Sequence, residues 1–84
     1  MSCVYVIYSQ SNKKCYIGSS REASADTRLQ AHNGGKTKST KSGRPWKIVH
    51  IEKYQTYSEA RKRELFLKSG QGRKFLKNIL AGEV

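Results

Sequence analysis

A chain of 84 residues is expected to form one small domain with one modest hydrophobic core, and it leaves no room for a second module. Its 17 lysines and arginines outnumber its 6 aspartates and glutamates, and the net charge of +11 makes polyanions the expected partners. Nucleic acid is favoured over a membrane, because the longest apolar run, Val4 to Tyr8, is only long enough for a strand. A basic surface that serves only solubility is the competing interpretation.

The cysteines and the ends of the chain bear on its compartment. Cys3 and Cys15 lie in separate apolar runs, and no further Cys or His falls at a spacing that completes a zinc site. We expect both to be small buried residues. A hairpin that turns near Ser11 and Asn12 places Cys15 opposite Tyr8, which argues against a disulfide. With no signal peptide, transmembrane run or lipidation motif, the expected location is cytoplasmic.

The first half of the chain predicts a β-hairpin, a helix and a loop. Residues 3 to 8 are almost all β-branched or aromatic, SQSNKK follows as a turn, and residues 15 to 18 form a second short strand. Ser24 is expected to cap a helix that ends at residues 33 to 35 and carries, at helical spacing, Ala25, Arg28, Leu29 and His32. Residues 36 to 44 are basic and contain glycine, which indicates a loop.

A third strand is predicted after Pro45, in the segment WKIVHIEKY. Simple alternation places on one face of this strand Trp46, Ile48, His50 and Glu52, and on the other Lys47, Val49, Ile51 and Lys53. Trp46 at its start is expected in the core, although it could also stack on an exposed base.

Two helices are predicted to complete the chain. Thr56 and Glu59 form a capping box for a helix from about residue 57 to 69, which Gly70 is expected to end. A last helix from about residue 72 to 80 has as its core face Phe75, Leu76, Ile79 and Leu80. The order ββαβαα predicts an α+β fold, with helices packed on a small three-stranded mixed or antiparallel sheet.

Two tyrosines share one face of the predicted hairpin. Tyr5 is expected opposite Gly18, and Ile7 opposite Tyr16, which places the phenols diagonally on one surface. They can serve as core packing, as hydrogen-bonding groups or as acid–base groups, and from the hairpin alone packing is favoured.

Three further side chains stand out on the helices. Arg28 and His32 are four positions apart, so they project from one face and could clamp a phosphate, although a solvated helix face is the competing interpretation. Glu64 lies in a stripe with Tyr57, Ala60 and Leu67, where a helix packed on a sheet should be apolar. A metal-binding or catalytic carboxylate explains this placement better than an ion pair with Arg61 or Lys68.

These residues fall into five segments that resemble the motifs of the GIY-YIG nuclease superfamily over nearly the whole chain. The resemblance is strongest to small single-domain bacterial members and to the catalytic domain of Slx-type structure-selective endonucleases. In this sequence the motifs are Cys3-Val4-Tyr5, Tyr16-Ile17-Gly18, Arg28-x-x-x-His32 with Asn33-Gly34-Gly35, the stretch from Thr40 to Trp46, and Ser58 to Glu64. Cys3 stands where the family name has Gly, and the stretch from Gly18 to Arg28 is a residue or two longer than is usual.

The resemblance implies hydrolysis of phosphodiester bonds with one divalent cation, Mg²⁺ or Mn²⁺, held by Glu64 and by water and substrate oxygens. Arg28 would neutralise charge on the attacked phosphate. Tyr16 is the first choice for the base that activates water and Tyr5 the second, while His32 would relay a proton or hold a phosphate.

The expected substrate is DNA, selected by its structure rather than its sequence, as in DNA repair. No recognition helix or finger motif is present, so basic residues are expected to bind the backbone, namely Lys36, Lys38, Lys41, Arg44, Arg73 and Lys74. Two alternatives are a non-catalytic nucleic-acid-binding module with the same fold and a nuclease subunit that needs a partner. A protein partner or a homodimer stays open.

Overall fold

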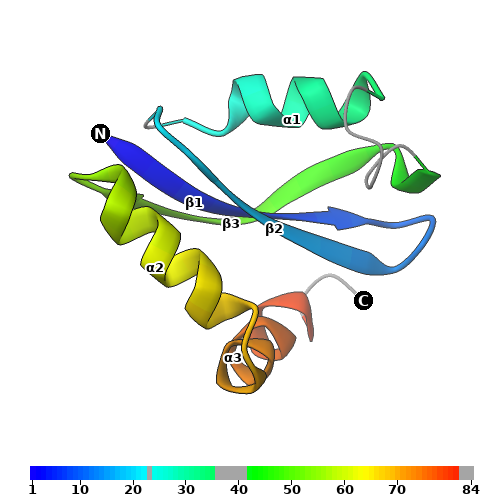
Figure 1. Cartoon of the computed structure of the whole chain (residues 1–84). Coiled ribbons are helices and arrows are strands. Elements are labelled where there is room, and N and C mark those ends of the chain that lie inside the picture. The colour runs from blue at the N-terminus through cyan, green and yellow to red at the C-terminus, as the bar shows by residue number, and fades with distance from the viewer. Residues whose placement is uncertain (23, 36–41, 82–84) are drawn as a thin grey trace.

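Strand β1, Ser2–Ser9, is the centre of a three-stranded antiparallel sheet and is buried along its whole length. The computed structural model describes residues 1–22, 24–35 and 42–81. The remaining elements are β2 (Lys14–Ser20), α1 (Asp26–Asn33), β3 (Trp46–Tyr54), α2 (Tyr57–Leu67) and α3 (Gly70–Leu80), and the strand order is β2-β1-β3. Figure 1 shows α1 on one side of the sheet and α2 and α3 on the other. This arrangement confirms the predicted α+β fold and its order ββαβαα.

The core has two layers because alternate residues of β1 point to opposite faces of the sheet. On the α1 side, Cys3, Tyr5 and Ile7 pack with Ala25 and Trp46. On the other side, a second cluster consists of Val4, Val6, Ile17, Leu67 and Leu76. A strand covered on both faces must be apolar at nearly every position, which is why residues 3 to 8 form one uninterrupted run. The prediction that Trp46 is a core residue is confirmed, since the residue is 7% exposed.

The hairpin has the predicted register. Tyr5 pairs with Gly18, Ile7 with Tyr16, and Tyr8 with Cys15. The expectation that both cysteines are buried is wrong for Cys15, which is exposed because it lies near the start of an edge strand. Both cysteines are free.

A bulge in β3 overturns the predicted alternation of that strand. Val6 pairs with His50 but Ile7 pairs with Ile48, so Val49 has no partner of its own and the strand changes face there. Ile48 packs in the α1-side cluster, whereas His50, paired with Val6, faces α2 and α3.

The first two helices begin and end close to the predicted positions. Ala25, not Ser24, is the N-cap of α1, although the Ser24 hydroxyl accepts a hydrogen bond from the Asp26 N–H at 3.1 Å. Gly35 follows the helix with a φ of 77°, a conformation that favours glycine. The capping box of Thr56 and Glu59 at the start of α2 is present as predicted.

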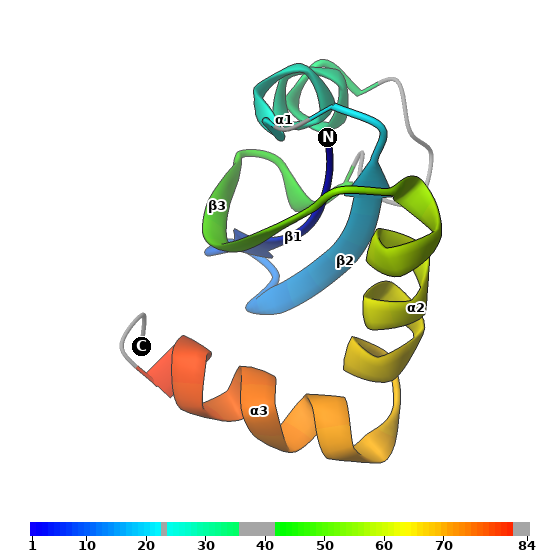
Figure 2. The same ribbon diagram turned by 90° about the vertical axis from the view of Figure 1, so that its left-hand side faces the viewer.

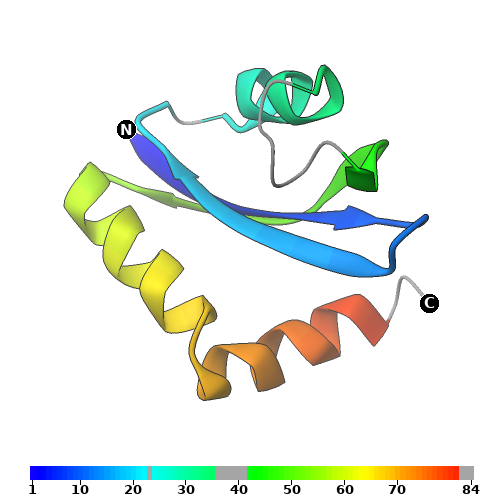
Figure 3. The same cartoon turned by 45° about the vertical axis from the view of Figure 1, so that its right-hand side comes forward.

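The expectation that Gly70 ends the second helix is wrong. α2 ends at Leu67, and Gly70 is the first residue of α3, with Ser69 as its N-cap. The two helices are therefore nearly continuous in sequence and meet at an angle beneath the sheet (Figure 3). The predicted core face of α3 is only partly correct. Leu76 is buried, but Phe75 is 36% exposed, and the Arg63 guanidinium carbon lies 5.1 Å from the centre of the Phe75 ring. No helix within the described ranges is both long and apolar enough to cross a bilayer.

An ion pair fixes α2 to the outer strand β3. The Arg63 guanidinium donates to both oxygens of Glu52, at 2.8 and 3.1 Å, and Tyr54 and His50 contact the same carboxylate. Because β3 is the strand farthest from β2, this contact and the packing on β1 fix the orientation of α2, whose other side lies against β2.

Candidate functional site

A polar pocket of about 260 Å³ is lined by residues of β1, β2, α1 and α2. Figure 2 shows α1 above β2 and α2 beside it. All five residues singled out by the sequence line it: Tyr5, Tyr16, Arg28, His32 and Glu64. The other lining residues are Gly18, Ser19, Ala31, Tyr57 and Arg61. The pocket lies at the β2 edge of the sheet instead of on one face, because Tyr5 and Tyr16 belong to the α1 face and Glu64 comes from the helix that covers the other.

The α1 wall of the pocket is a contact among Tyr5, Tyr16 and His32. The Tyr5 hydroxyl oxygen lies 3.2 Å from His32 Nε2, and the rings of Tyr16 and His32 are 4.8 Å apart between centres. Tyr5 and His32 are 3% and 4% exposed, whereas Tyr16 is half-buried. Tyr16 is therefore the phenol that a ligand in the pocket can reach more easily.

Burial determines the protonation of this wall. Desolvation, with the neighbouring phenol of Tyr16, raises the pKa of Tyr5 to about 12. Desolvation, with the positive charge of Arg28, lowers the pKa of His32 below its ordinary value. Both groups are therefore neutral near pH 7, and one proton lies between them.

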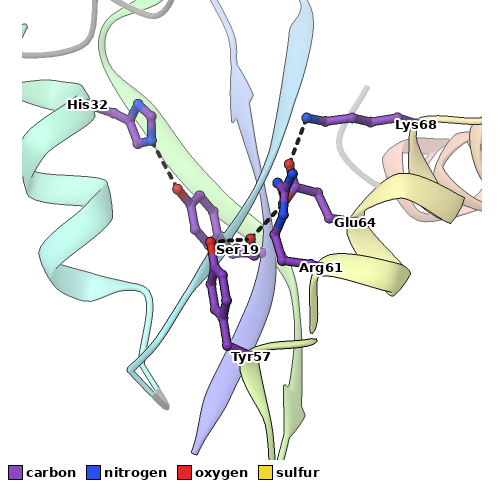
Figure 4. A network of polar contacts seen from close by, with 7 residues as sticks. Ser19, His32, Tyr57, Arg61, Glu64 and Lys68 are labelled. Carbon is purple, nitrogen blue, oxygen red and sulfur yellow. Dashed lines mark hydrogen bonds and ion pairs between the residues drawn. The ribbon is translucent and has the colours of Figure 1, made fainter. Parts of the chain in front are cut away.

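Glu64 provides the opposite wall, and it is 4% exposed although it lies on a mostly solvated helix. Its Oε1 accepts hydrogen bonds from Ser19 Oγ at 2.6 Å and from an Arg61 guanidinium nitrogen at 2.7 Å, and its Oε2 accepts one from Lys68 Nζ at 2.7 Å. Figure 4 shows these three donors around the carboxylate. The sequence favoured a metal-binding or catalytic carboxylate over an ion pair with Arg61 or Lys68, and the structure shows ion pairs with both for a carboxylate that also lines the pocket.

These contacts keep Glu64 ionised. Burial alone would raise the pKa of Glu64, but the hydrogen bonds from Lys68, Ser19 and Arg61 outweigh it, and the pKa lies below its ordinary value. The pocket therefore holds a buried, charged carboxylate opposite the neutral phenol of Tyr5.

Arg28 differs from the other charged groups of the pocket. Its side chain is exposed, and in the described part of the chain it forms no hydrogen bond or ion pair. It lies one helical turn from His32, as the sequence predicted. An exposed guanidinium at the mouth of a pocket is suited to bind an anion.

Three of the five other lining residues have polar side chains, and none of the three was among the predicted site residues. Ser19 directly follows the Tyr-Ile-Gly motif, Tyr57 was assigned to an apolar stripe, and Arg61 was weighed only as an ion-pair partner. The Tyr57 hydroxyl lies 3.5 Å from Ser19 Oγ, and the Arg21 guanidinium stacks 4.2 Å from the centre of the Tyr57 ring. The capping box at Thr56 was the available signal, because it fixes the first turn of α2 and hence the place of Tyr57.

Of the residues predicted to bind the nucleic-acid backbone, the three that the structure describes lie outside this pocket. Lys36, Lys38 and Lys41 lie outside the described residues. Arg44 is exposed at the start of β3, where it lies 3.5 Å from the Asn33 carbonyl oxygen. Arg73 and Lys74 are exposed on α3, and Arg73 borders a separate, mainly apolar groove with Cys15 and Leu76.

Comparison with known proteins identifies the family of this chain. The model of the GIY-YIG catalytic domain matches residues 1–78. A UPF0213 protein of Syntrophus aciditrophicus (strain SB) is 44% identical over 71 residues, which cover 81% of this chain and 79% of that protein. No solved structure matches the chain significantly. Because the family model covers residues 1–78 and the relative is 44% identical, the chain belongs to the GIY-YIG catalytic domain family.

Proposed function

We propose that this chain is a divalent-metal-dependent endonuclease that hydrolyses phosphodiester bonds in DNA and selects its substrate by structure. GIY-YIG domains are usually nucleases, so membership of the family supports a phosphodiester-hydrolysing enzyme with nucleic acid as its substrate. The observation that carries the proposal is the pocket in which an ionised, buried carboxylate faces two phenols and an exposed arginine.

The residues of the pocket fit a single divalent cation, which nucleases of this family generally use. Glu64 is the only carboxylate that lines the pocket, and within residues 1–22, 24–35 and 42–81 no three His, Cys, Asp or Glu side chains cluster as metal ligands. A hard cation accepts one carboxylate when water and phosphate oxygens complete its coordination. Glu64 would hold Mg²⁺ or Mn²⁺, which when bound supplies positive charge next to the scissile phosphate.

The other residues have roles that follow from their exposure and contacts. Arg28, exposed and without an ion pair among the described residues, binds the phosphate and offsets the charge that builds on it. Tyr16, the more accessible phenol, acts as its phenolate: it releases its own proton to solvent and then takes the proton of the attacking water. Tyr5 and His32 form a buried neutral pair that orients this phenol.

The preference for structure over sequence follows from charge and from the shape of the site. The net charge of +11 acts mainly on phosphates, which carry no sequence information. A pocket at the edge of a sheet admits a strand that leaves a duplex at a branch or flap. We therefore expect binding that weakens steeply with salt and varies little between sequences of the same shape.

A cleavage panel with Glu64→Gln tests the proposal. Flaps, junctions, single strands, plasmid DNA and RNA are incubated with the purified chain and Mg²⁺ or Mn²⁺, with and without a chelator. We expect metal-dependent cleavage of branched DNA, its loss in Glu64→Gln, and unchanged or slightly tighter DNA binding by that variant when the chelator is present. Glu22→Gln is the matched control, because Glu22 is exposed and lies outside the pocket.

Each contrary outcome of the panel has its own meaning. Cleavage by Glu64→Gln equal to that of the parent would exclude the proposed site. Tight binding without cleavage of any substrate by the parent would favour the non-catalytic module or the subunit that needs a partner.

A further inference from the structure

Arg61 is the one cation that both lines the pocket and contacts the Glu64 carboxylate in the described structure. Arg28 lines the pocket without touching Glu64, and Lys68 binds Glu64 without lining the pocket. The side chain of Arg61 is 48% exposed, against 5% for the side chain of Glu64. The Arg61 guanidinium can therefore contact the Glu64 carboxylate or an anion that enters the pocket from solvent.

The two carboxylate oxygens of Glu64 are not equivalent. Oε1 accepts from Ser19 and Arg61, both of which line the pocket, so this oxygen belongs to the pocket side and both of its acceptor positions are used. Oε2 accepts from Lys68 alone in the described structure, on the side away from the pocket. A cation that approaches Oε1 from the pocket therefore meets the Arg61 guanidinium first.

We propose that Arg61 is a second phosphate-binding arginine of this site and that it leaves Glu64 for a backbone phosphate oxygen when nucleic acid binds. This inference rests on the proposed function. The Arg61 guanidinium is half-exposed, so a phosphate that enters from solvent can reach it and compete for it, while Ser19 and Lys68 still hold the carboxylate. The planar guanidinium also matches a phosphate as well as a carboxylate, with two parallel hydrogen bonds.

The exchange links the two ligands of the site. Once Arg61 turns to phosphate, Oε1 is free for the divalent cation while Ser19 and Lys68 keep the carboxylate in place. Nucleic acid then tightens cation binding, and by reciprocity the cation tightens nucleic-acid binding by the same factor. Without substrate, the paired carboxylate binds the cation weakly.

The test measures Mn²⁺ binding by electron paramagnetic resonance, with and without a 12-base-pair DNA duplex whose integrity is checked on a gel. Glu64→Gln, measured in parallel, gives the Mn²⁺ held by the duplex itself, which is subtracted. In the parent we expect the duplex to tighten Mn²⁺ at the site by about 5-fold or more, within the usual range of coupling between two sites. In Arg61→Gln we expect tighter Mn²⁺ binding without DNA and a change of less than about 2-fold on adding the duplex.

Lys68→Gln is the matched control, because it removes an equal charge at an equal distance, 2.7 Å, from the same carboxylate. It should also bind Mn²⁺ more tightly, but it should keep the coupling to DNA. Equal coupling in Arg61→Gln and the parent, or equal loss in both variants, would overturn the exchange. If Glu64→Gln binds as much Mn²⁺ as the parent, the metal assignment in the proposed function fails instead.

A second measurement needs no variant. The guanidinium N–H signals of Arg61, followed by nuclear magnetic resonance, should shift when the duplex is added without metal. Signals that stay in place would also overturn the proposal.

Discussion

Tyr5 lies directly opposite Gly18 in the β1–β2 pair, and a Cβ at Gly18 would lie 2.5 Å from the Tyr5 hydroxyl oxygen. The phenol therefore extends over the strand only because position 18 has no side chain. This position brings its hydroxyl within 3.2 Å of His32 on α1. The glycine of the second motif thus controls the geometry of the tyrosine of the first.

Gly18→Ala should displace the Tyr5 ring and disrupt its contact with His32. Because Tyr5 is buried in the α1-side cluster, we expect a loss of stability of about 1–3 kcal/mol, typical of overpacking. Cleavage should fall by at least about 10-fold, since small misplacements of site groups are costly. Urea unfolding and cleavage rates measure the two effects. Gly70→Ala is the control, because nothing lies within 4 Å of a Cβ there, and parent-like behaviour of Gly18→Ala would contradict this account.

Ser19→Ala tests whether the hydrogen bond to Glu64 positions the carboxylate. The variant loses a 2.6 Å bond to a charged group, of a kind worth about 1.5–3 kcal/mol, while Arg61 and Lys68 still hold Glu64. We expect the cleavage rate to fall by about 10-fold, which is 1.4 kcal/mol, with DNA affinity unchanged.

Ser20→Ala provides the comparison for Ser19→Ala. Ser20 is the neighbouring buried serine, it lies outside the pocket, and its hydroxyl accepts only from the Glu22 N–H in the described structure. Single-turnover rates separate the two variants. A slower rate in Ser20→Ala than in Ser19→Ala would indicate that strand stability, and not the position of Glu64, controls cleavage.

Local signals predicted the hairpin and singled out five of the ten residues that line the pocket. The turn near residues 11 and 12 and the period of two fix which residues of β1 and β2 are opposite each other, and this pairing places Tyr5, Tyr16 and Gly18 together. Glu64 stood out because a carboxylate interrupts an apolar stripe. Arg61 and Lys68 were named as possible partners of Glu64, but Ser19 was not, since it carries no periodic signal and its contact with Glu64 joins residues 45 apart in sequence.

Two features of the fold could not be predicted from patterns of this kind. Nothing in the sequence WKIVHIEKY indicates the bulge at Val49, because each face of the strand carries a mixture of apolar and polar residues whether or not the bulge is present. Gly70 is typical of a helix end, but here the chain turns at Lys68 and Ser69. Gly72 then packs so tightly against the backbone of Phe66 and Leu67 that a side chain at position 72 would clash. Tertiary packing decided both positions.

The stability of the fold should depend on pH through Glu52, remote from the pocket. Burial alone would raise the pKa of Glu52, but hydrogen bonds from Arg63, His50 and Tyr54 outweigh it and lower the pKa from 4.5 to about 2. A carboxyl whose pKa is lower in the folded chain stabilises it fully above pH 4.5, and this stabilisation is lost as the pH falls towards 2. With a side chain 19% exposed, the contribution is at most about 3 kcal/mol.

Urea unfolding of the parent and of Glu52→Gln from pH 7 to pH 2.5 checks this expectation. The parent should be the more stable protein at pH 7, and the difference between the two should shrink steadily below pH 4.5. Subtracting the two curves removes the contribution of Glu64, whose pKa is also lowered. A difference that stays constant over this range would show that the ion pair with Arg63 does not control acid stability.

The two tyrosines of the pocket should differ in how they affect the pH dependence of cleavage. The pKa of about 12 keeps Tyr5 protonated throughout the range from pH 6 to pH 10, so its ionisation cannot shape the rate profile there. Tyr5→Phe should therefore lower the rate by a constant factor at every pH, through the loss of the contact with His32. Tyr16→Phe should lower the rate much more, about 100-fold or beyond, because it removes the proposed proton acceptor, and it should flatten the alkaline part of the profile. Single-turnover cleavage from pH 6 to pH 10 with Mg²⁺ decides between them, provided that both variants unfold at the same urea concentration as the parent. If Tyr5→Phe flattens the profile and Tyr16→Phe leaves its shape intact, the two roles are reversed, and Tyr5 must lose its proton in the substrate complex despite its burial.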